Sequence, residues 1–278
     1  MKLITTDAQL RAHIPNIIAS VKGEVPFIER LALFLDLAED WVKNTFTSES
    51  TFNTICGYTD SNPVKILTAR LVVADALRRA IPSLDIVLTS NGFGVVNTSN
   101  LAPASKPRVD RLVDSMLAHR DDCIAALLPE IVGASKWLAS DRADYFGATL
   151  FPDLAIVDSL GSVQGSRWEK YLELRSQVID LEASLAEEWF STELMSALRS
   201  ENLRGDLTEK RSEIVRQTQA QIVGYLKGGS FSSRRLADIV NYIRLNESEF
   251  VEWHKSDTTK LFAPPIFRNE KKASGYFF

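Results

Sequence analysis

The stretch PFIERLALFLDLAEDWVKNTF, from Pro26 to Phe46, carries the clearest structural signal in the chain. Its apolar residues recur at steps of three and four, which places them on one broad face of an α-helix. They are Phe27, Ile28, Leu31, Phe34, Leu35, Ala38, Trp41 and Val42. The spacing therefore predicts a helix from Pro26 to Phe46 whose apolar face packs against other helices.

Similar patterns predict helices on both sides of this stretch. Thr6 and Gln9 form a capping box that opens a short helix, DAQLRAHI, which must end before Pro15. The stretch PVKILTARLVVADALRRAI, from Pro63, is apolar on most sides. It predicts a buried central helix that stops at Pro82.

Helical patterns continue to residue 254. Ser105 suits an N-cap and Pro107 a first helical turn, so a helix is predicted from there to about Leu128. Ser166 and Glu169 form a second capping box. Later helical segments are predicted over 166–199, with a break near Ser191 and Thr192, over 207–227 and over 232–254.

One stretch interrupts the helical patterns. DIVLTS and GFGVVN are rich in β-forming residues, and the SNG between them is a turn signal, so a β-hairpin is predicted from Asp85 to Asn97. The Gly-Phe-Gly is no dinucleotide fingerprint, because it lacks the third glycine and no helix opens directly after it.

Parts of the first half recur in the second. AEDW, at 38–41, returns as AEEW at 186–189, an offset of 148 residues, and at this offset Thr68–Pro82 falls on Arg216–Ser230. Arg111-Leu112 matches Arg235-Leu236 at an offset of 124. These matches indicate a diverged tandem repeat with the hairpin inserted in the first copy; the alternative is a chance alignment of helical sequences.

The predicted fold class is therefore mainly α, with two related helical halves and one β-hairpin inserted in the first half. The predicted divisions are a helical repeat with the hairpin over 1–147, a second helical repeat over 148–256 and an extended C-terminal tail over 257–278. The tail is predicted to be loop-like.

The 278 residues show no recognisable catalytic motif. Apolar residues make up 45% and charged residues 24%, and the net charge of −4 argues against a general nucleic-acid binder. His13, His119, His254, Cys56 and Cys123 lack metal-ligand spacing, and no phosphate loop or nucleophile elbow occurs. No catalytic, cofactor-binding or metal-ligating set is predicted, so no cofactor is expected. We expect a protein that is not an enzyme, with two reduced thiols and neither a signal peptide nor a membrane span.

Three groups of residues are candidate partner contacts. The first two are the hairpin, with Asn91, Phe93 and Val95, and the start of the following helix, with Lys106, Arg108 and Arg111. The third is the tail, with Phe267, Tyr276, Phe277 and Phe278. Apolar residues near a chain end either pack back, stay free, or dock into a neighbouring copy, and these three alternatives are left open.

Three strings together resemble an uncharacterised family encoded in prophages and phage-like elements of gut Bacteroidetes. They are ITTDAQLRAHIPN, GFGVVNTSNLAPASKPRVDRL and IFRNEKKASGYFF. Such proteins are encoded among virion morphogenesis genes. The layout of the first half is also similar to the small head–tail connector proteins of tailed phages, although this chain is about twice as long.

The resemblance implies a virion structural protein, a head–tail connector or adaptor that binds other virion proteins and copies of itself. It would be found in the cytoplasm during assembly and in the virion of an active phage. The alternative is a nucleic-acid-binding accessory protein that uses the hairpin and places Lys106, Arg108 and Arg111 on phosphates. A third class, an enzyme with an unrecognised site, would show convergent titratable groups in a pocket.

Overall fold

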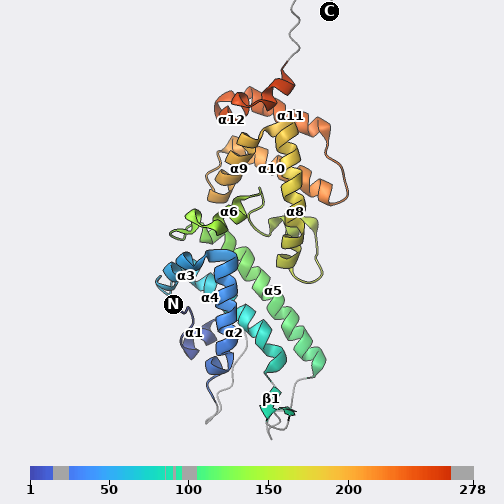
Figure 1. Cartoon of the computed structure of the whole chain (residues 1–278). Coiled ribbons are helices and arrows are strands. Elements are labelled where there is room, and N and C mark those ends of the chain that lie inside the picture. Colours follow the sequence, from blue (N-terminus) through green and yellow to red (C-terminus); the bar gives the residue numbers. More distant parts are fainter. Residues whose placement is uncertain (15–24, 85, 90–91, 96–104, 264–278) are drawn as a thin grey trace, which may run out of the picture.

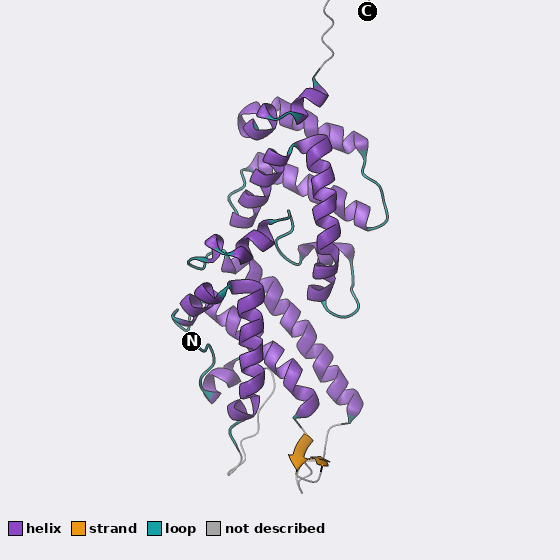
Figure 2. Ribbon diagram, viewed as in Figure 1, coloured by secondary structure: helices purple, strands orange, loops and turns teal. Residues whose placement is uncertain are grey.

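A computed structural model describes residues 1–14, 25–84, 86–89, 92–95 and 105–263, with the backbone alone for 86–89 and 92–95. The described chain forms an elongated helical body (Figures 1 and 2). The first half, residues 1–147, forms one end of this body, and the second half, 148–263, forms the other.

The described first half is built from six α-helices and three short turns of other helical types. They are α1 (Asp7–Ala12), α2 (Phe27–Val42), η1 (Lys43–Thr47), α3 (Glu49–Cys56), α4 (Pro63–Ala80), η2 (Ile81–Ser83), α5 (Lys106–Ile131), η3 (Trp137–Ala139) and α6 (Asp141–Gly147). Here α4 packs between α2 and α5.

The described second half contains a further six α-helices. Its elements are α7 (Ala155–Leu160), α8 (Arg167–Leu185), η4 (Ala186–Phe190), α9 (Thr192–Arg204), α10 (Glu209–Leu226), α11 (Ser233–Leu245), η5 (Glu247–Glu249), α12 (Val251–Lys255) and η6 (Thr258–Phe262). The predicted break near Ser191 is confirmed, since Ser191 ends η4 and caps α9.

Side-chain caps explain where many helices begin. The capping box of Thr6 and Gln9 is confirmed at α1. Ser166, Thr208 and Ser232 each accept a hydrogen bond from the backbone N–H three residues on, which satisfies a free donor of the first turn. Ser105 is the N-cap of α5, but its side chain makes no capping hydrogen bond.

The hairpin is the part of the predicted fold class that needs correction. Two strands of four residues, β1 (Ile86–Thr89) and β2 (Gly92–Val95), pair antiparallel (Figure 2). Among the described residues they pair with nothing else, and a lone two-stranded ribbon is only marginally stable by itself. The fold class is therefore mainly α, and the prediction that counted an inserted β-hairpin as part of it is corrected; Asp85, residues 90–91 and 96–97 lie outside the described residues.

The core runs through both halves. The central helix is confirmed, because α4 buries side chains all round, from Val64 to Ala80. Large aromatic residues fill the rest of the core, and Trp137, Phe146, Phe190 and Trp253 are fully buried. Burying such side chains supplies much of the driving force for folding.

The two halves repeat the same order of elements. In each, a short helix leads to a long one that ends in a π-helical turn, and a serine with a positive φ then caps the next helix. These serines, Ser48 and Ser191, lie 143 residues apart, with φ of 67° and 66°. The predicted offset of 148 residues is therefore corrected to 143 at this point. Whether 147/148 divides two domains stays a prediction.

Three elements differ from the sequence-based expectation. The helix α3 follows the break at Ser48, in a stretch for which no helix was predicted. The last predicted helix ends at Leu245, and a short 3₁₀ turn separates it from α12. The predicted tail begins later, because residues up to Phe262 form η6 and Phe262 packs against Trp189 and Trp253.

Candidate interaction site

The contact residues predicted from sequence do not form one site in the described structure. Asn91, Phe267, Tyr276, Phe277 and Phe278 lie outside the described residues. The backbone of Phe93 pairs with Leu88 and that of Val95 with Ile86, and nothing further is described for them.

The basic residues of α5 lie on its first two turns. The Lys106 ammonium lies 2.7 Å from the Asp110 carboxylate, so its charge is partly compensated. The Arg111 side chain donates to the backbone oxygen of Pro107. Arg108 is exposed on the same turn. Because Asp110 and Asp114 share this part of the helix, it is not a uniformly basic surface.

A different site stands out, at a buried glutamate of each half. Glu39 of α2 and Glu182 of α8 are 4% and 0% exposed. They lie 143 residues apart, as Ser48 and Ser191 do. Each carboxylate accepts a hydrogen bond of 2.8 Å, from Leu3 N–H and from Leu150 N–H respectively. A charged group in an apolar core needs such partners, because desolvation penalises it heavily.

Each of these N–H groups belongs to a buried apolar dipeptide. The dipeptides are Leu3-Ile4 and Leu150-Phe151, and all four side chains are at most 5% exposed. Two positions later, a polar side chain accepts a hydrogen bond from the first turn of the next helix in both: Thr6, the N-cap of α1, accepts from Gln9 N–H, and Asp153, one residue before the N-cap of α7, accepts from Ala155 N–H. We call such a dipeptide with its capping residue the docking segment of its half.

The second docking segment has a dense set of polar partners. The Leu150 carbonyl oxygen accepts from the side-chain amides of Asn202, at 2.9 Å, and Gln219, at 2.6 Å. The Tyr171 hydroxyl donates to Phe151 O at 3.1 Å. The Arg199 side chain lies 2.7 Å from the second oxygen of Glu182. Both oxygens of Glu182 and the carbonyl oxygens of Leu150 and Phe151 are thereby paired.

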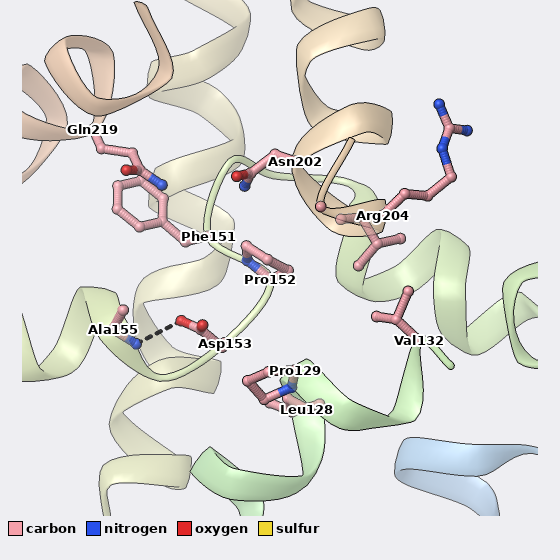
Figure 3. Close-up of a pocket in the computed structure, with 12 residues that line it drawn as sticks. Leu128, Pro129, Val132, Phe151, Pro152, Asp153, Ala155, Asn202, Arg204 and Gln219 are labelled. Atoms are coloured by element: carbon pink, nitrogen blue, oxygen red, sulfur yellow. Dashed lines mark hydrogen bonds between the residues drawn. The ribbon is translucent and has the colours of Figure 1, made fainter. Parts of the chain in front are cut away.

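Figure 3 shows this segment from the side of a pocket of about 280 Å³. Phe151, Pro152 and Asp153 cross the pocket, and Asn202 and Gln219 point toward them from the neighbouring helices. The Asp153 carboxylate accepts from Ala155 N–H at 2.8 Å, which fixes the entry into α7. Leu128 and Pro129 of α5 close the pocket from the first half.

The first docking segment has fewer partners. Burial raises the pKa of the Glu39 carboxyl, against the hydrogen bonds from the Leu3 and Ile4 amides. Burial also raises the pKa of Glu182, but there Arg199 opposes the shift. No arginine takes the place of Arg199 beside Glu39 in the described structure. A hollow of about 360 Å³ runs beside the segment along α2.

In each half, a buried tryptophan bonds to a backbone oxygen at the π-helical turn and packs against a phenylalanine; we call this group the aromatic clasp. The indole N–H of Trp137 donates to Phe46 O at 2.7 Å, and that of Trp253 donates to Trp189 O at 2.9 Å. A phenylalanine nine residues after each tryptophan completes the clasp. These residues are Phe146 and Phe262. The clasps fix Phe46 and Trp189 as equivalent positions, 143 residues apart.

A buried polar cluster joins the halves. The Arg120 guanidinium donates to Asp121 at 2.8 Å and to the Ser166 hydroxyl at 2.7 Å. That hydroxyl donates to the second oxygen of Asp121 and also caps α8. Trp168 packs beside the cluster, 4.9 Å from the ring of Phe46. Ionic and hydrogen-bonded groups so well matched hold two elements in one orientation.

Other titratable groups have structural surroundings. Both cysteines are free, and burial raises the pKa of Cys123 to about 11, which suppresses the reactive thiolate. In the described ranges, no three His, Cys, Asp or Glu side chains gather where one metal ion could bind them. Nor does any described helix have the length and apolarity needed to cross a membrane.

The sequence contained a signal for the glutamate site that was not used. Glu39 follows Leu35 by four residues and precedes Val42 by three, so it falls on the apolar face of α2. A charged residue on a buried face requires a partner. The pattern of two apolar residues shortly before a helix cap was present as well.

The geometry defines a class of protein, an all-helical chain whose two halves each hold a docked apolar segment on a buried glutamate. Comparison with known families places one part of it: residues 26–146 match a family of unknown function, DUF6712. The match begins one residue before α2 and ends in α6, so it covers most of the first half and none of the second. No curated protein and no solved structure matches the chain.

Proposed function

We propose that this protein is a non-enzymatic structural protein of a phage or prophage virion, a head–tail connector or adaptor that acts through protein–protein contacts. Its partners are other virion proteins and copies of itself. It is assembled in the cytoplasm and carried into the virion when the phage is active.

One observation carries the proposal. The joint between the halves has features of a protein–protein interface, an aromatic contact between Phe46 and Trp168 and a buried arginine, Arg120, that is paired with Asp121 and bonded to Ser166. The contacts that join the two halves within one chain are of the kind that join separate subunits in an assembly. The resemblance of its strings to prophage proteins supplies the virion context.

The buried charges support the same proposal. Asp75 is paired with Arg78 and Arg79, and Arg211 is paired with Glu201 and Glu252. In each case the partners come from the same helix or from neighbouring elements, and the pairs hold helices together. These buried charges therefore stabilise the packing of the helices, as expected of a scaffold protein.

Particle analysis tests the proposal. Virions from the wild-type element should contain this protein, and deletion of its gene should give separate heads and tails. A plasmid copy should restore joined particles, whereas a Phe93→Asp copy should not. Leu245→Asp serves as the matched control, because Leu245 is 84% exposed on the second half. Particles that lack the protein, or that form normally after deletion, would refute the connector role.

The nucleic-acid alternative has weaker support. Lys106 is paired with Asp110, and the whole chain has a net charge of −4. A phosphate-binding helix would need its cations free to face the backbone. DNA binding that weakens with added salt, and that Arg108→Ala and Arg111→Ala reduce, would revive this alternative.

A further inference from the structure

The docking segment occurs a third time in the sequence, after η6. Leu-Ile-Thr-Thr begins at Leu3, Leu-Phe-Pro-Asp at Leu150, and Ile-Phe-Arg-Asn at Ile266. Each string has two large apolar residues, one variable residue and one residue that caps helices well. The third string lies outside the described residues, so its likeness rests on sequence.

Its position relative to the aromatic clasp supports the likeness. Leu150 follows Trp137 by 13 residues, and Ile266 follows Trp253 by 13. The two tryptophans are equivalent, because each donates its indole N–H to the backbone oxygen of an equivalent residue. The third string therefore has the same position relative to the second clasp as the Leu150 segment has relative to the first.

No vacant glutamate site is within its reach in the same molecule. Both sites in the described structure already hold a segment. Two residues separate Ala263 from Ile266, so the Cα atom of Ile266 lies at most roughly 10 Å from that of Ala263. The helix α12 lies at the far end of the second half, and Ala263 follows it by eight residues, whereas α2 lies in the first half (Figure 1). A third segment that docks as the first two do would therefore need a site in another molecule.

The Glu39 site is the better acceptor of the two. The segment at Glu182 is held by the amides of Asn202 and Gln219, by a tyrosine hydroxyl and by a glutamate paired with arginine. The described structure gives Leu3-Ile4 no such amide donors. Fewer polar bonds must break to exchange the first segment than the second.

Charge also favours the Glu39 site. Thr5 lines the hollow beside α2 together with Glu29 and Asp36, and Asp36 is paired there with Lys2, which precedes the first docking segment and would leave with it. In the third segment, Arg268 stands at the position of Thr5. Docking there would bring the Arg268 cation to two carboxylates, and such complementarity favours one partner surface over others.

We propose that Ile266-Phe267 of one copy dock on Glu39 of a second copy, in the place of Leu3-Ile4, and join the copies head to tail. The contact is heterologous, since the second half of one copy meets the first half of the next, so it generates a ring or a filament. It does not depend on the virion role and can be measured on the purified protein.

A labelled peptide of residues 263–272 tests the docking on the full 278-residue chain. Fluorescence anisotropy should show saturable binding, and Phe267→Asp in the peptide should weaken it roughly 10- to 100-fold, the loss expected for one buried aromatic side chain. Leu3→Ser in the chain should strengthen binding several-fold, because it weakens the competing segment. Leu245→Ser is the matched control and should change nothing.

Hydrogen exchange locates the site. Bound peptide should speed amide exchange in residues 3–12, which are displaced, and leave residues 150–160 unchanged. In the full chain, Phe267→Asp should also abolish concentration-dependent association in sedimentation. The proposal fails if no binding occurs, if Phe267→Asp has no effect, or if exchange changes elsewhere and not in residues 3–12. Such a failure would leave the connector role open, because particle composition decides that role.

Discussion

Glu39 and Glu182 accept hydrogen bonds of the same length, from Leu3 N–H and Leu150 N–H, yet their surroundings differ. Arg199 neutralises Glu182, and two side-chain amides hold the segment docked there. Glu39 has the backbone amides alone as hydrogen-bond donors in the described structure. The comparison teaches that one docking geometry can be reinforced by several side-chain partners in one half and held by backbone amides in the other.

The largest expected effects test whether the clasps of the two halves are equivalent. Trp137→Ala and Trp253→Ala should each lower the free energy of unfolding by roughly 3–5 kcal/mol, because each deletes a buried indole and its hydrogen bond. Denaturant unfolding measures both variants. Trp137→Phe is the matched control and should cost less, since it keeps an aromatic ring. A much smaller effect at Trp253 would break the equivalence.

The next effect separates the two glutamate sites. Arg199→Met should destabilise the protein by about 3 kcal/mol, because Glu182 would be left buried without its counter-charge. Adding Glu182→Gln should recover much of this loss. Glu39→Gln alone should cost less than about 1 kcal/mol, because the amide oxygen still accepts from Leu3 N–H. Equal costs for Glu39→Gln and Arg199→Met would contradict the proposed difference.

A smaller effect is expected at the serines that follow the π-helical turns. Ser48 and Ser191 adopt φ,ψ of 67°, 160° and 66°, 150°, a region that costs non-glycine residues about 1–3 kcal/mol. Ser48→Gly and Ser191→Gly should therefore stabilise the protein by about 1 kcal/mol each, despite the lost caps. Ser→Ala at either position keeps the strain, loses the cap and should destabilise. Thermal unfolding compares the four variants, and a destabilising glycine would count against strain.

The smallest effect concerns pH. Burial raises the pKa of Glu39 above its ordinary value of 4.5, so the folded state holds this proton more tightly than the unfolded state. Stability should rise as pH falls from above the folded pKa toward 4.5, and the penalty of the charge is fully present above the folded pKa. Glu39→Gln should flatten the stability–pH curve, and the slope that Glu182 contributes should remain. Parallel curves for the two proteins would refute the assignment.

Local signals in the sequence were reliable wherever one turn of chain decided the outcome. The capping box at Thr6, the central helix α4 and the break at Ser191 were all predicted, because caps and apolar periodicity act within a few residues. The hairpin shows the limit of such signals. Its residues favour strands, but two strands of four residues do not change the class of a helical fold.

A match between short strings of sequence did not decide the residue offset between the two halves. AEDW and AEEW aligned Trp41 with Trp189, whereas the clasps equate Phe46 with Trp189. Helical sequences match one another at several offsets, because their apolar positions recur every three or four residues. The hydrogen bonds of the tryptophans and glutamates select one offset.

The sequence by itself determined a helical protein with its caps, its breaks and its apolar faces, because these depend on residues close together in the chain. Only the tertiary structure decided that Glu39 and Glu182 each hold an apolar segment, that Trp137 and Trp253 clasp equivalent residues, and that Arg120 and Ser166 join the halves. These contacts link residues 32 to 91 positions apart. Their partners are set by how the helices pack, and spacing along the chain does not encode that packing.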